Sequence, residues 1–448
     1  MKETHAYDVI VVGGGTGGLR AAMMLSQTKK TLLIEPGALG GTCLNVGCIP
    51  TKAMLHAAKT FKEIKAAKEL GIVASPKLQF TTLMNRVRSI ITEGQKHIKR
   101  GIIKKDLLTI VKKKAIFLSA KKIAAGQEHY TAPKILISTG AKNFVPPIEG
   151  LIDYLDNESI IQLTKLPKSL IMIGGGYISM EFASFFALLG TKITILERAP
   201  TVLGMLDEDI RRELVAEYEE MGVKMITNCD ILSIKRVTGG FEASIKDLTT
   251  GKPGKVRAEK VSVSVGRIPN TKELEHTGIQ LTKRGGIYVN DQMQTTVSGV
   301  YAIGDCTGKA LFAHAAKREC LITVNNILHS KKKKISLDLV PWAVFTHPVI
   351  AGVGLSETQA STMGFSYNVH KASFTRCGRA EIINQKNGFV KILVDTKSRR
   401  VIGATIIGAN ADDIIHEFVI LMQLKGTYEQ FKEAIHIHPT LSEVCENL

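Results

Sequence analysis

The sequence predicts an α/β protein with two Rossmann-like dinucleotide-binding domains, the second inserted in the first, and a C-terminal α+β domain. A unit of strand, glycine-rich turn, helix and second strand occurs twice, over residues 8–35 and 170–197. The C-terminal segment, residues 335–448, combines strand patterns with one helix. At 448 residues the chain is long enough for about three domains.

The first unit carries a complete glycine pattern between a strand and a helix. Asp8–Val12 has a buried-strand pattern and is followed by Gly13, Gly15 and Gly18. The first glycine permits a tight turn, the second lets the backbone approach a pyrophosphate, and the third allows close packing of helix and strand. The free N–H groups of the helix N-terminus favour phosphate. Glu35 ends the next strand, where its carboxylate can accept hydrogen bonds from ribose hydroxyls.

The second unit repeats this layout with one change. Gly174 and Gly176 follow a strand pattern, but Ser179 stands in the third glycine position. Serine is small enough to preserve the packing of helix on strand. Glu197 ends the next strand, and a carboxylate there accepts bonds from a 2′-hydroxyl and repels a 2′-phosphate. The unit therefore favours NAD over NADP, although the adjacent Arg198 leaves phosphate binding open.

The order of these patterns predicts that the first domain is discontinuous. A proline pair within Phe144–Pro147 follows one strand pattern, and another strand pattern returns at Lys260–Val265. We interpret Lys331–Lys334 as a linker into the last domain. The expected boundaries are residues 1–145 and 266–334 for the first domain, 146–265 for the second, and 335–448 for the last.

The motif Gly41–Lys52 (GTCLNVGCIPTK) carries the most specific chemistry. Its two cysteines, Cys43 and Cys48, lie next to a helix expected over Ala53–Lys68. Pairing requires their Cα atoms to approach within about 7 Å, which a bent first turn can provide. A helix N-terminus and a nearby lysine, Lys52, would lower a thiol pKa and make a thiolate available at neutral pH.

A zinc half-site is the alternative interpretation of the two cysteines. No second cysteine pair or suitably spaced Cys/His pair completes such a site in the sequence. The motif therefore predicts a redox-active thiol pair and no metal. The other five cysteines are isolated in sequence, and we expect them to be ordinary reduced thiols.

A histidine and an acid near the C-terminus form a second candidate. His438 precedes a proline, and Glu443 follows five residues later. A His–Glu pair raises imidazole basicity and fixes its tautomer, as a base that activates a thiol requires. A surface histidine without a catalytic role is the alternative.

The net charge of +18 is large for a chain of this size. The lysines are spread along the chain, with short clusters at Lys112–Lys114 and Lys331–Lys334. Since no aromatic residues interleave with them and no nucleic-acid-binding motif is present, we expect a solvated surface and no nucleic-acid partner. Docking of an acidic protein is one alternative. A protein that holds nucleic acid or a membrane on its basic surface is an alternative from a different class.

Membrane and export signals are not found in the sequence. No apolar run approaches the roughly 18 residues that a membrane span requires. The segment Met1–Tyr7 is short and polar, and a strand pattern follows it directly, which leaves no room for a signal or transit peptide. We therefore expect a cytoplasmic protein without a membrane partner.

On the cysteine motif and the ending His438–Glu443 (HPTLSE), the chain resembles the class I pyridine nucleotide–disulfide oxidoreductases over essentially its whole length. Within that family it most resembles the dihydrolipoamide dehydrogenases. The resemblance implies FAD in the first domain and NAD in the second. It implies oxidation of a dithiol such as protein-bound dihydrolipoamide, with an acidic lipoyl-type protein as one conceivable partner. It also implies a homodimer joined through the last domain.

The resemblance assigns roles to particular residues. Cys43 would be the interchange thiol, and Cys48 a thiolate facing the flavin, with Lys52 beside the ring. In this family, His438 and Glu443 reach the site from the other subunit. FAD contacts are implied at Gly13, Gly15, Gly18, Glu35, Lys52, Gly140, Asp305 and Ala313, and NAD contacts at Gly174, Gly176, Tyr177, Glu181, Glu197 and Gly266.

The sequence departs from other branches of the family. Mercuric reductases end in an adjacent cysteine pair, and high-molecular-weight thioredoxin reductases need a second redox pair at the C-terminus. In this sequence Cys445 stands alone, so both features are missing. Glutathione reductases usually carry arginines for NADP; here only Arg198 is available, and Gly204 stands where a second would be expected. NAD(P)H-dependent reduction of another disulfide, or of mercuric ion, is the alternative function.

Overall fold

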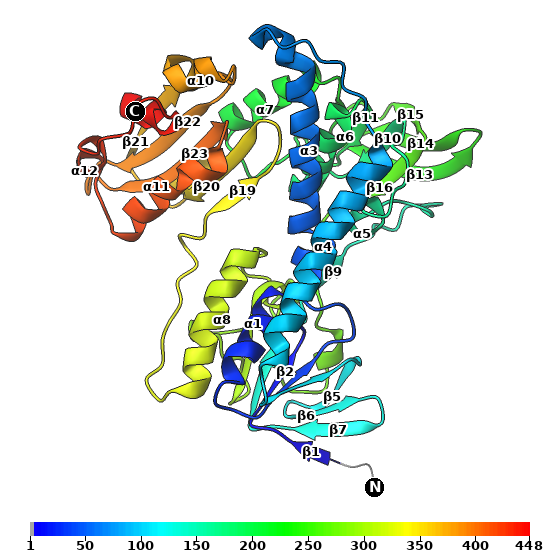
Figure 1. The fold of residues 1–448 in the computed structure, drawn as a ribbon, viewed down its shortest axis with the longest axis vertical. Helices are drawn as coiled ribbons and strands as arrows, with labels where there is room; N and C mark the ends of the chain where they lie inside the picture. Colours follow the sequence, from blue (N-terminus) through cyan, green and yellow to red (C-terminus); the bar gives the residue numbers. More distant parts are fainter. Residues whose placement is uncertain (1–3) are drawn as a thin grey trace. The chain divides into compact units, whose positions relative to one another are not determined.

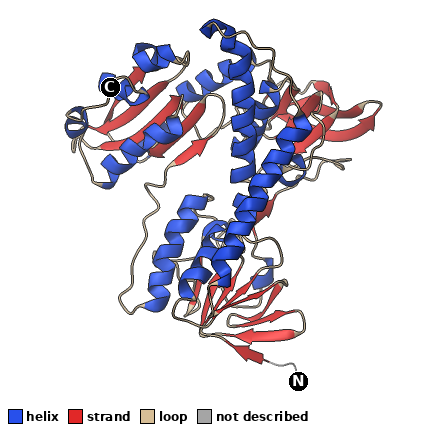
Figure 2. Cartoon of the chain, viewed as in Figure 1, coloured by secondary structure: helices blue, strands red, loops and turns tan. Residues whose placement is uncertain are grey.

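The computed structural model describes residues 4–448 (Figure 1). The chain divides into two compact units, each assembled from three segments. The first unit comprises the segment ending at Ala53 with Thr82–Phe144 and Gly266–Leu337. The second comprises Met54–Thr81, Val145–Val265 and Asp338–Leu448. Both units mix helices and strands (Figure 2).

The first unit is built on a five-stranded parallel sheet with the strand order β18-β8-β2-β3-β4. Its strands are short apolar runs, and the central ones are buried on both faces, as is typical of parallel sheets. The register aligns Val9 with both Thr31 and Lys134, so the strands begin at a common edge. The strands are β2 (Val9–Val12), β3 (Thr31–Ile34), β4 (Leu108–Val111), β8 (Lys134–Ile137) and β18 (Val300–Ala302).

The helices α1 and α8 pack side by side against this sheet (Figure 1). Gly17 favours their close approach, because an added Cβ would lie 3.3 Å from the Ala316 carbonyl oxygen of α8 and 2.9 Å from the Ile303 side chain. The helices α3 and α4 each continue along the chain from one unit into the other. The helices are α1 (Thr16–Leu25), α2 (Gly41–Asn45), α3 (Cys48–Ala66), α4 (Phe80–Ile103) and α8 (Ala313–Leu328), with short 3-10 helices η1 (Ala67–Leu70), η2 (Lys272–Leu274) and η3 (Gly304–Thr307).

Two smaller sheets complete the first unit. One has four strands in the order β1-β7-β6-β5, and the other pairs β9 with β17. The second pair joins the two chain segments that enter and leave the region between residues 145 and 265. The strands are β1 (Thr4–Ala6), β5 (Ala115–Ser119), β6 (Lys122–Ala125), β7 (Glu128–Thr131), β9 (Ala141–Asn143) and β17 (Arg267–Pro269).

The second unit repeats the strand–glycine–helix arrangement. A four-stranded parallel sheet has the order β12-β11-β10-β16, and α6 follows β10 directly after the glycine turn. An antiparallel sheet of β13, β14 and β15 lies within the same segment of the chain. The elements are β10 (Ser169–Ile173), β11 (Lys192–Leu196), β12 (Lys224–Ile226), β13 (Cys229–Val237), β14 (Gly240–Asp247), β15 (Pro253–Ala258), β16 (Lys260–Val263), α5 (Asn157–Ile160), α6 (Tyr177–Leu188) and α7 (Glu208–Glu220).

The C-terminal part of the second unit is a five-stranded antiparallel sheet with the order β19-β20-β23-β22-β21. The amphipathic helix α11 buries its apolar face against β20 and β23. The elements are β19 (Trp342–Val344), β20 (Val349–Gly354), β21 (Tyr367–Ser373), β22 (Phe389–Asp395), β23 (Val401–Gly408), α9 (Glu357–Thr362), α10 (Gly378–Ile382), α11 (Ala411–Gln423), α12 (Tyr428–Lys432), η4 (Phe374–Arg376) and η5 (Leu441–Asn447).

These sheets confirm the predicted fold class. Two parallel sheets each follow the strand–glycine–helix layout, and an antiparallel sheet with a covering helix forms the C-terminal part. The predicted linker Lys331–Lys334 lies outside any helix or strand and hydrogen-bonds to the Asn326 side chain near the end of α8. Within residues 4–448, every helix is too short or too polar to serve as a transmembrane segment.

A buried ion-pair cluster joins two parts of the second unit. The Lys391 side chain on β22 is 2% exposed, and its Nζ lies 2.9 Å from Asp207, 2.7 Å from Asp209 and 2.6 Å from Glu357. Burial alone would lower the pKa of Lys391, but hydrogen bonds to these carboxylates outweigh it and raise the pKa. In the described part of the chain, this is the one group of three potential metal ligands, and the Lys391 ammonium group already lies between the three carboxylates.

Replacing Lys391 by methionine should destabilise the protein by about 3–5 kcal/mol, because it removes the one buried cation that all three carboxylates share. Lys371→Met is the matched control, since Lys371 is 41% exposed and pairs only with Asp209. The control should cost no more than about 1 kcal/mol. Urea unfolding followed by circular dichroism measures both effects. Equal and small losses in the two variants would show that the cluster does not stabilise the second unit.

Candidate active site

The two predicted redox cysteines lie on consecutive helices. Cys43 is half-buried on α2, and Cys48 is exposed and opens α3. Gly47 separates the helices, and a Cβ there would lie 2.9 Å from the Thr42 carbonyl oxygen, so the tight fold-back favours glycine. Both cysteines are free thiols, and a hydrogen bond joins their side chains. The structure therefore brings the predicted pair together.

The two thiols differ strongly in acidity. The pKa of Cys43 is lowered to about 6, mainly by a hydrogen bond from the Cys48 thiol; burial opposes this. The Thr16 hydroxyl and the ammonium groups of Lys317 and Lys52 lower it further. The pKa of Cys48 is raised, because its proton is held in the same hydrogen bond and because burial and the charge on Cys43 disfavour a second thiolate. The pair therefore loses one proton near neutral pH and retains the other.

The side chain of Asn45, between the two cysteines, organises the loop that carries them. Its Nδ2 donates to the carbonyl oxygens of Leu39 at 3.1 Å and Gly41 at 2.8 Å. Its Oδ1 accepts a hydrogen bond of 2.7 Å from Gln95 on α4. The sequence analysis missed both residues. The only available signal was an amide between the cysteines, which can donate and accept at once.

The first glycine loop has the geometry that a phosphate site requires. Gly13 has φ +103°, and a Cβ there would lie 2.2 Å from the Ser138 carbonyl oxygen. A Cβ on Gly18 would lie 2.0 Å from the Gly13 carbonyl oxygen, so the helix packs directly on the turn. Gly15 has no atom within 4 Å of its missing Cβ and leaves the backbone open to a ligand. A Cβ on Gly41 would lie 2.7 Å from the Gly15 Cα, so the cysteine motif begins against this loop.

The second glycine loop is similar. Gly174 has φ +100°, and a Cβ there would meet the Ser264 carbonyl oxygen at 2.7 Å. Gly176 has no neighbour within 4 Å of its missing Cβ. Ser179, in the third glycine position, is fully buried, so the helix accommodates its side chain. The serine at the third glycine position is therefore compatible with the turn, as the sequence predicted.

An acid at the end of the next strand holds each loop in the same way. The Glu35 carboxylate accepts a hydrogen bond of 2.6 Å from the Gly14 amide, and Glu197 accepts one from the Gly175 amide. In each case the second carboxylate oxygen accepts the N–H two residues further along the chain. The two predicted ribose-binding acids thus lie directly beside their glycine loops. Arg198 points to Asp230, at 3.8 Å.

The predicted flavin residue Asp305 lies in η3, ahead of Ala313, the first residue of α8. Burial raises the pKa of Asp305, and the Arg267 guanidinium, 3.9 Å away, opposes this. Glu319 on α8 accepts a hydrogen bond of 2.6 Å from the Gly304 amide, and burial raises its pKa to about 7. Glu319 therefore fixes the turn that presents Asp305, a role that the sequence analysis missed.

Two further predicted glycines adjoin the paired strands β9 and β17. Gly140, φ +68°, precedes β9, and Gly266, φ +132°, precedes β17. Both backbone conformations favour glycine. The Gly140 carbonyl accepts from the Asn270 amide at 2.9 Å, and the Gly266 carbonyl accepts from the Phe144 amide at 3.0 Å. Both glycines belong to the first unit, although Gly266 was expected to contact NAD.

The other predicted nicotinamide residues lie on α6 in the second unit. Tyr177 is its first residue, and Glu181 is buried one turn further on. The Glu181 carboxylate accepts a hydrogen bond of 3.0 Å from the Phe345 amide, and Ser184 accepts one of 3.1 Å from the His347 amide. Helix α6 therefore anchors the loop between β19 and β20.

The predicted pair of His438 and Glu443 is present. The Nδ1 of His438 lies 2.7 Å from a Glu443 carboxylate oxygen, and the other oxygen accepts from the Thr440 amide at 2.6 Å. These two hydrogen bonds lower the pKa of Glu443. With Nδ1 donating to the carboxylate, Nε2 of His438 is left to accept a proton, and the side chain is 80% exposed. The Cys377 thiol donates to the Thr440 carbonyl oxygen at 3.4 Å and supports the same segment.

The remaining cysteines differ from the redox pair. All five are buried free thiols: Cys229, Cys306, Cys320, Cys377 and Cys445. Burial raises the thiol pKa of four of them, Cys229, Cys306, Cys320 and Cys445. Among the cysteines of the described chain, Cys43 is the one whose pKa is lowered.

Comparison with known proteins defines the class. Residues 7–320 match the family described as pyridine nucleotide-disulphide oxidoreductase, and residues 340–448 match its dimerisation domain. The chain therefore belongs to the class I pyridine nucleotide–disulfide oxidoreductases and is close to lipoamide dehydrogenase. It is an FAD- and NAD-dependent enzyme. The two glycine loops fit these dinucleotides, because each leaves its central glycine open and holds an acid beside it.

Three relatives illustrate how far the similarity extends. Dihydrolipoyl dehydrogenase 1, mitochondrial, of Arabidopsis thaliana is 34% identical over 98% of this chain and 89% of its own length. Dihydrolipoyl dehydrogenase of Thermus scotoductus is 33% identical over 98% of this chain and 95% of its own. The solved HOCl-induced flavoprotein disulfide reductase RclA of Escherichia coli matches with a TM-score of 0.89 and 27% identity, over 99% of both chains.

The lowered pKa of Cys43 predicts the pH dependence of its alkylation. In the reduced enzyme, alkylation of Cys43 by iodoacetamide should accelerate with a midpoint near pH 6, because the thiolate is the nucleophile. Mass spectrometry of timed samples measures the rate at each pH. Cys48→Ala removes the hydrogen bond and should move the midpoint upward toward the ordinary thiol range. An unchanged midpoint in that variant would contradict the assigned cause.

Proposed function

We propose that the chain oxidises a dithiol such as protein-bound dihydrolipoamide, with NAD⁺ as the final acceptor. The observation that carries the proposal is the Cys43–Cys48 pair, in which one thiol ionises near neutral pH and the other retains its proton. The His438–Glu443 pair supports it, because a dithiol substrate must lose a proton before it can attack a disulfide.

The reaction begins with Cys43 and Cys48 joined as a disulfide. Nε2 of His438 takes the proton of one substrate thiol while Glu443 stabilises the resulting imidazolium. The substrate thiolate attacks the Cys43 sulfur, the bond between the two cysteines breaks, and Cys48 leaves as a thiolate. The second substrate thiol then loses its proton and attacks the mixed disulfide, which releases Cys43. Of the two protons that the substrate gives up, one stays on the reduced cysteine pair and the other passes from His438 to solvent. The substrate leaves as a disulfide, and two electrons remain on the cysteine pair.

FAD, when bound, would supply the two-electron chemistry that connects the thiol pair with NAD⁺. The protein supplies the positions of the groups. Lys52 and Lys317 place positive charge near the thiol pair, and Asn45 holds the loop between the cysteines. Asp305 in η3, ahead of α8, is available for the flavin, and Glu197 is available for the NAD ribose. Pairing of Arg198 with Asp230 supports NAD as the preferred nucleotide.

We propose that His438 and Glu443 act on the thiol pair of the other protomer in a homodimer. The match of residues 340–448 to the dimerisation domain supports a homodimer. Exposed aliphatic side chains in the same part of the chain, such as Ile435 at 97% and Ile437 at 79%, support burial against a second copy. Ile435 and Ile437 flank His436 immediately before His438, so dimer formation would bring this segment into the interface.

The proposed domain boundaries follow from the same interpretation. We propose FAD binding by residues 1–145 and 266–334, NAD binding by 146–265, and dimerisation by 335–448. The division of the chain into compact units changes at residues 145, 266 and 338, which supports these boundaries, and it also assigns residues 54–81 to the second unit. The seven free thiols support a reducing compartment such as the cytoplasm.

A second candidate function is NAD(P)H-dependent reduction of another disulfide or of a metal ion. The similarity to RclA favours it, since that flavoprotein disulfide reductase has been solved as a Cu(II) complex. Such a reaction would use Cys43 and Cys48 but would not need His438 to deprotonate a dithiol. The two functions therefore differ in their dependence on His438.

Substitution of His438 by glutamine should lower kcat for dihydrolipoamide oxidation by about 10²–10⁴-fold, the usual contribution of a general base. The exposed residue His97 provides the matched control, and His97→Gln should retain full activity.

Cys43→Ser should abolish dithiol oxidation while FAD stays bound, as measured by the flavin absorbance of the purified variant. Steady-state assays with dihydrolipoamide and NAD⁺ measure the activities.

Full dithiol activity in the His438 variant would contradict the proposed role of the base. If, in addition, NADH-dependent reduction of Cu(II) or of another disulfide exceeded dihydrolipoamide oxidation and depended on Cys43, the second candidate function would replace the first.

A further inference from the structure

The net positive charge of this protein comes from one unit. The segments of the first unit contain 30 lysines and arginines against 11 aspartates and glutamates, whereas those of the second contain 29 against 30. The basic residues are divided almost evenly between the units, in agreement with their spread along the chain, and the asymmetry arises because the first unit contains few acidic residues. It is hard to see in the sequence, because the first unit is assembled from three separated segments.

Many of these lysines meet at one edge of the parallel sheet. Lys29 and Lys30 directly precede β3, Lys104 and Lys105 precede β4, and Lys134 is the first residue of β8. Since these strands are parallel and in register at their first residues, the lysines lie along the edge where the strands begin. The glycine loop follows β2 at the opposite edge of the same sheet.

A recess lies beside this edge. It has a volume of about 420 Å³ and is lined by Tyr7, Lys121 and Lys122 together with small and polar residues. The Nζ of Lys30 lies 4.8 Å from the centre of the Tyr7 ring, so Lys30 borders the recess. We call the lysines of the strand edge and the recess the basic edge: Lys29, Lys30, Lys104, Lys105, Lys121, Lys122 and Lys134.

The charges of the basic edge are not neutralised within the chain. Among residues 4–448, none of its ammonium groups lies within 4.0 Å of a carboxylate, whereas other lysines of the same unit are paired. Lys114 lies 2.6 Å from Glu273, and Lys334 lies 2.8 Å from Asp291. Repulsion among so many like charges is unfavourable, and a negatively charged partner would relieve it.

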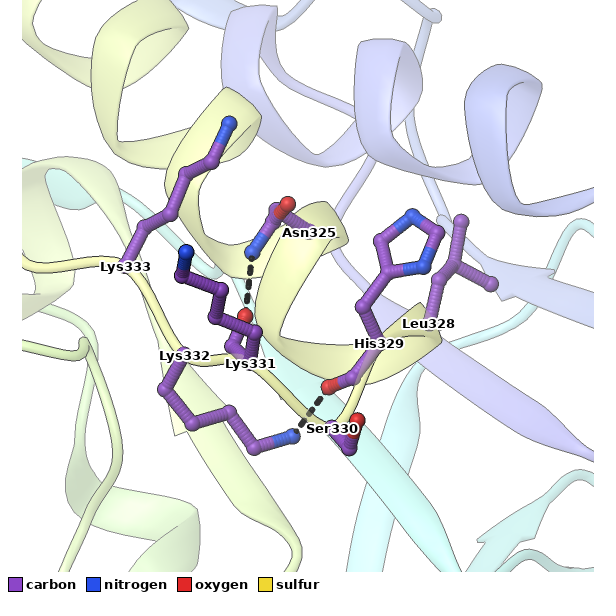
Figure 3. Close-up of a pocket in the computed structure, with 7 residues that line it drawn as sticks. All are labelled: Asn325, Leu328, His329, Ser330, Lys331, Lys332 and Lys333. Atoms are coloured by element: carbon purple, nitrogen blue, oxygen red, sulfur yellow. Dashed lines mark hydrogen bonds between the residues drawn. The ribbon is translucent and has the colours of Figure 1, made fainter.

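A second basic recess lies at the C-terminal end of α8 (Figure 3). It has a volume of about 530 Å³ and is lined by Asn325, Leu328, His329, Ser330 and Lys331–Lys333. Helices α1 and α8 pack side by side (Figure 1), and each follows a strand of the same parallel sheet, α1 after β2 and α8 after β18. Both helices therefore run back toward the ends where the strands begin, where Lys29 and Lys30 precede β3.

The lysines of this recess are held in place. The Asn326 side chain donates to the Lys333 carbonyl at 2.9 Å and accepts from the Lys333 amide at 2.7 Å. The Nζ of Lys332 donates to the carbonyl oxygens at the helix end, including His329 at 2.7 Å. Lys331 and Lys333 extend to the other side of the segment (Figure 3). The helix end thus uses one lysine as a cap and leaves two for a ligand.

We propose that the basic edge and the α8 recess form a docking surface for an acidic, extended segment of a partner protein. The cations of this surface are all lysines, whereas bidentate recognition of phosphates in nucleic acids favours arginine. Two recesses can admit carboxylate side chains of a peptide but not a planar bilayer. The surface lies at the opposite edge of the sheet from the glycine loop, so a partner bound there leaves that loop accessible.

The test measures binding of a fluorescein-labelled peptide of alternating glutamate and serine to the full-length holoenzyme by fluorescence anisotropy. The affinity should fall as ionic strength rises from about 0.05 to 0.2 M, because screening weakens exposed charges. Lys29→Glu/Lys30→Glu/Lys121→Glu should weaken binding by at least about tenfold. All three lysines are exposed, and none belongs to the proposed catalytic site. Activity with dihydrolipoamide should therefore be unchanged.

The matched control is Lys165→Glu/Lys168→Glu/Lys192→Glu, which changes the net charge equally on exposed lysines of the second unit. It should change the affinity by no more than about twofold. Equal losses in both triple variants, or no peptide binding by the wild type, would overturn the proposal. Tighter binding of duplex DNA or of phosphatidylserine vesicles than of the peptide, lost in the first triple variant, would also overturn it by identifying a different partner.

Discussion

The chemistry of this enzyme depends on one hydrogen bond between two sulfur atoms. Cys43 ionises near pH 6, whereas Cys48 beside it retains its proton. A thiol with such a low pKa can attack a disulfide as a thiolate and can also leave as a thiolate when a mixed disulfide is broken. The chain around the pair maintains that contact. Gly47 lets the chain fold back between the cysteines, and Asn45 fixes the loop against α4. The five other cysteines are buried, which keeps their thiols out of exchange reactions.

The two nucleotide sites share a single construction. In each, an acid at the end of the second strand accepts a hydrogen bond from a backbone amide of the glycine loop. This hydrogen bond places a carboxylate beside the open central glycine of the loop. The same device therefore recurs in the two loops that we propose for FAD in the first unit and NAD in the second. Contact between Gly41 and Gly15 places the cysteine motif against the first of these loops, so the thiol pair and the flavin site share one structural element.

Sequence patterns predicted the parts of this structure that arise from local geometry. The glycine loops, Glu35, Glu197 and the cysteine pair were predicted because their spacing reports on turns and helix ends. Other features depend on contacts between distant segments. Lys391 looks like a solvated strand residue in the sequence, and only the fold brings three carboxylates to it. The charge asymmetry was missed for the same reason, because the first unit is assembled from separated segments.

Counting thiols tests the central claim most directly, because the chain has seven cysteines and only the pair should change state. The oxidised holoenzyme, denatured anaerobically with a thiol reagent, should show five reactive thiols. After anaerobic reduction with one equivalent of NADH it should show seven, and the two new ones should map to Cys43 and Cys48 by mass spectrometry. An identical count before and after NADH would contradict the account, since electrons would then not pass between the nicotinamide and the thiol pair.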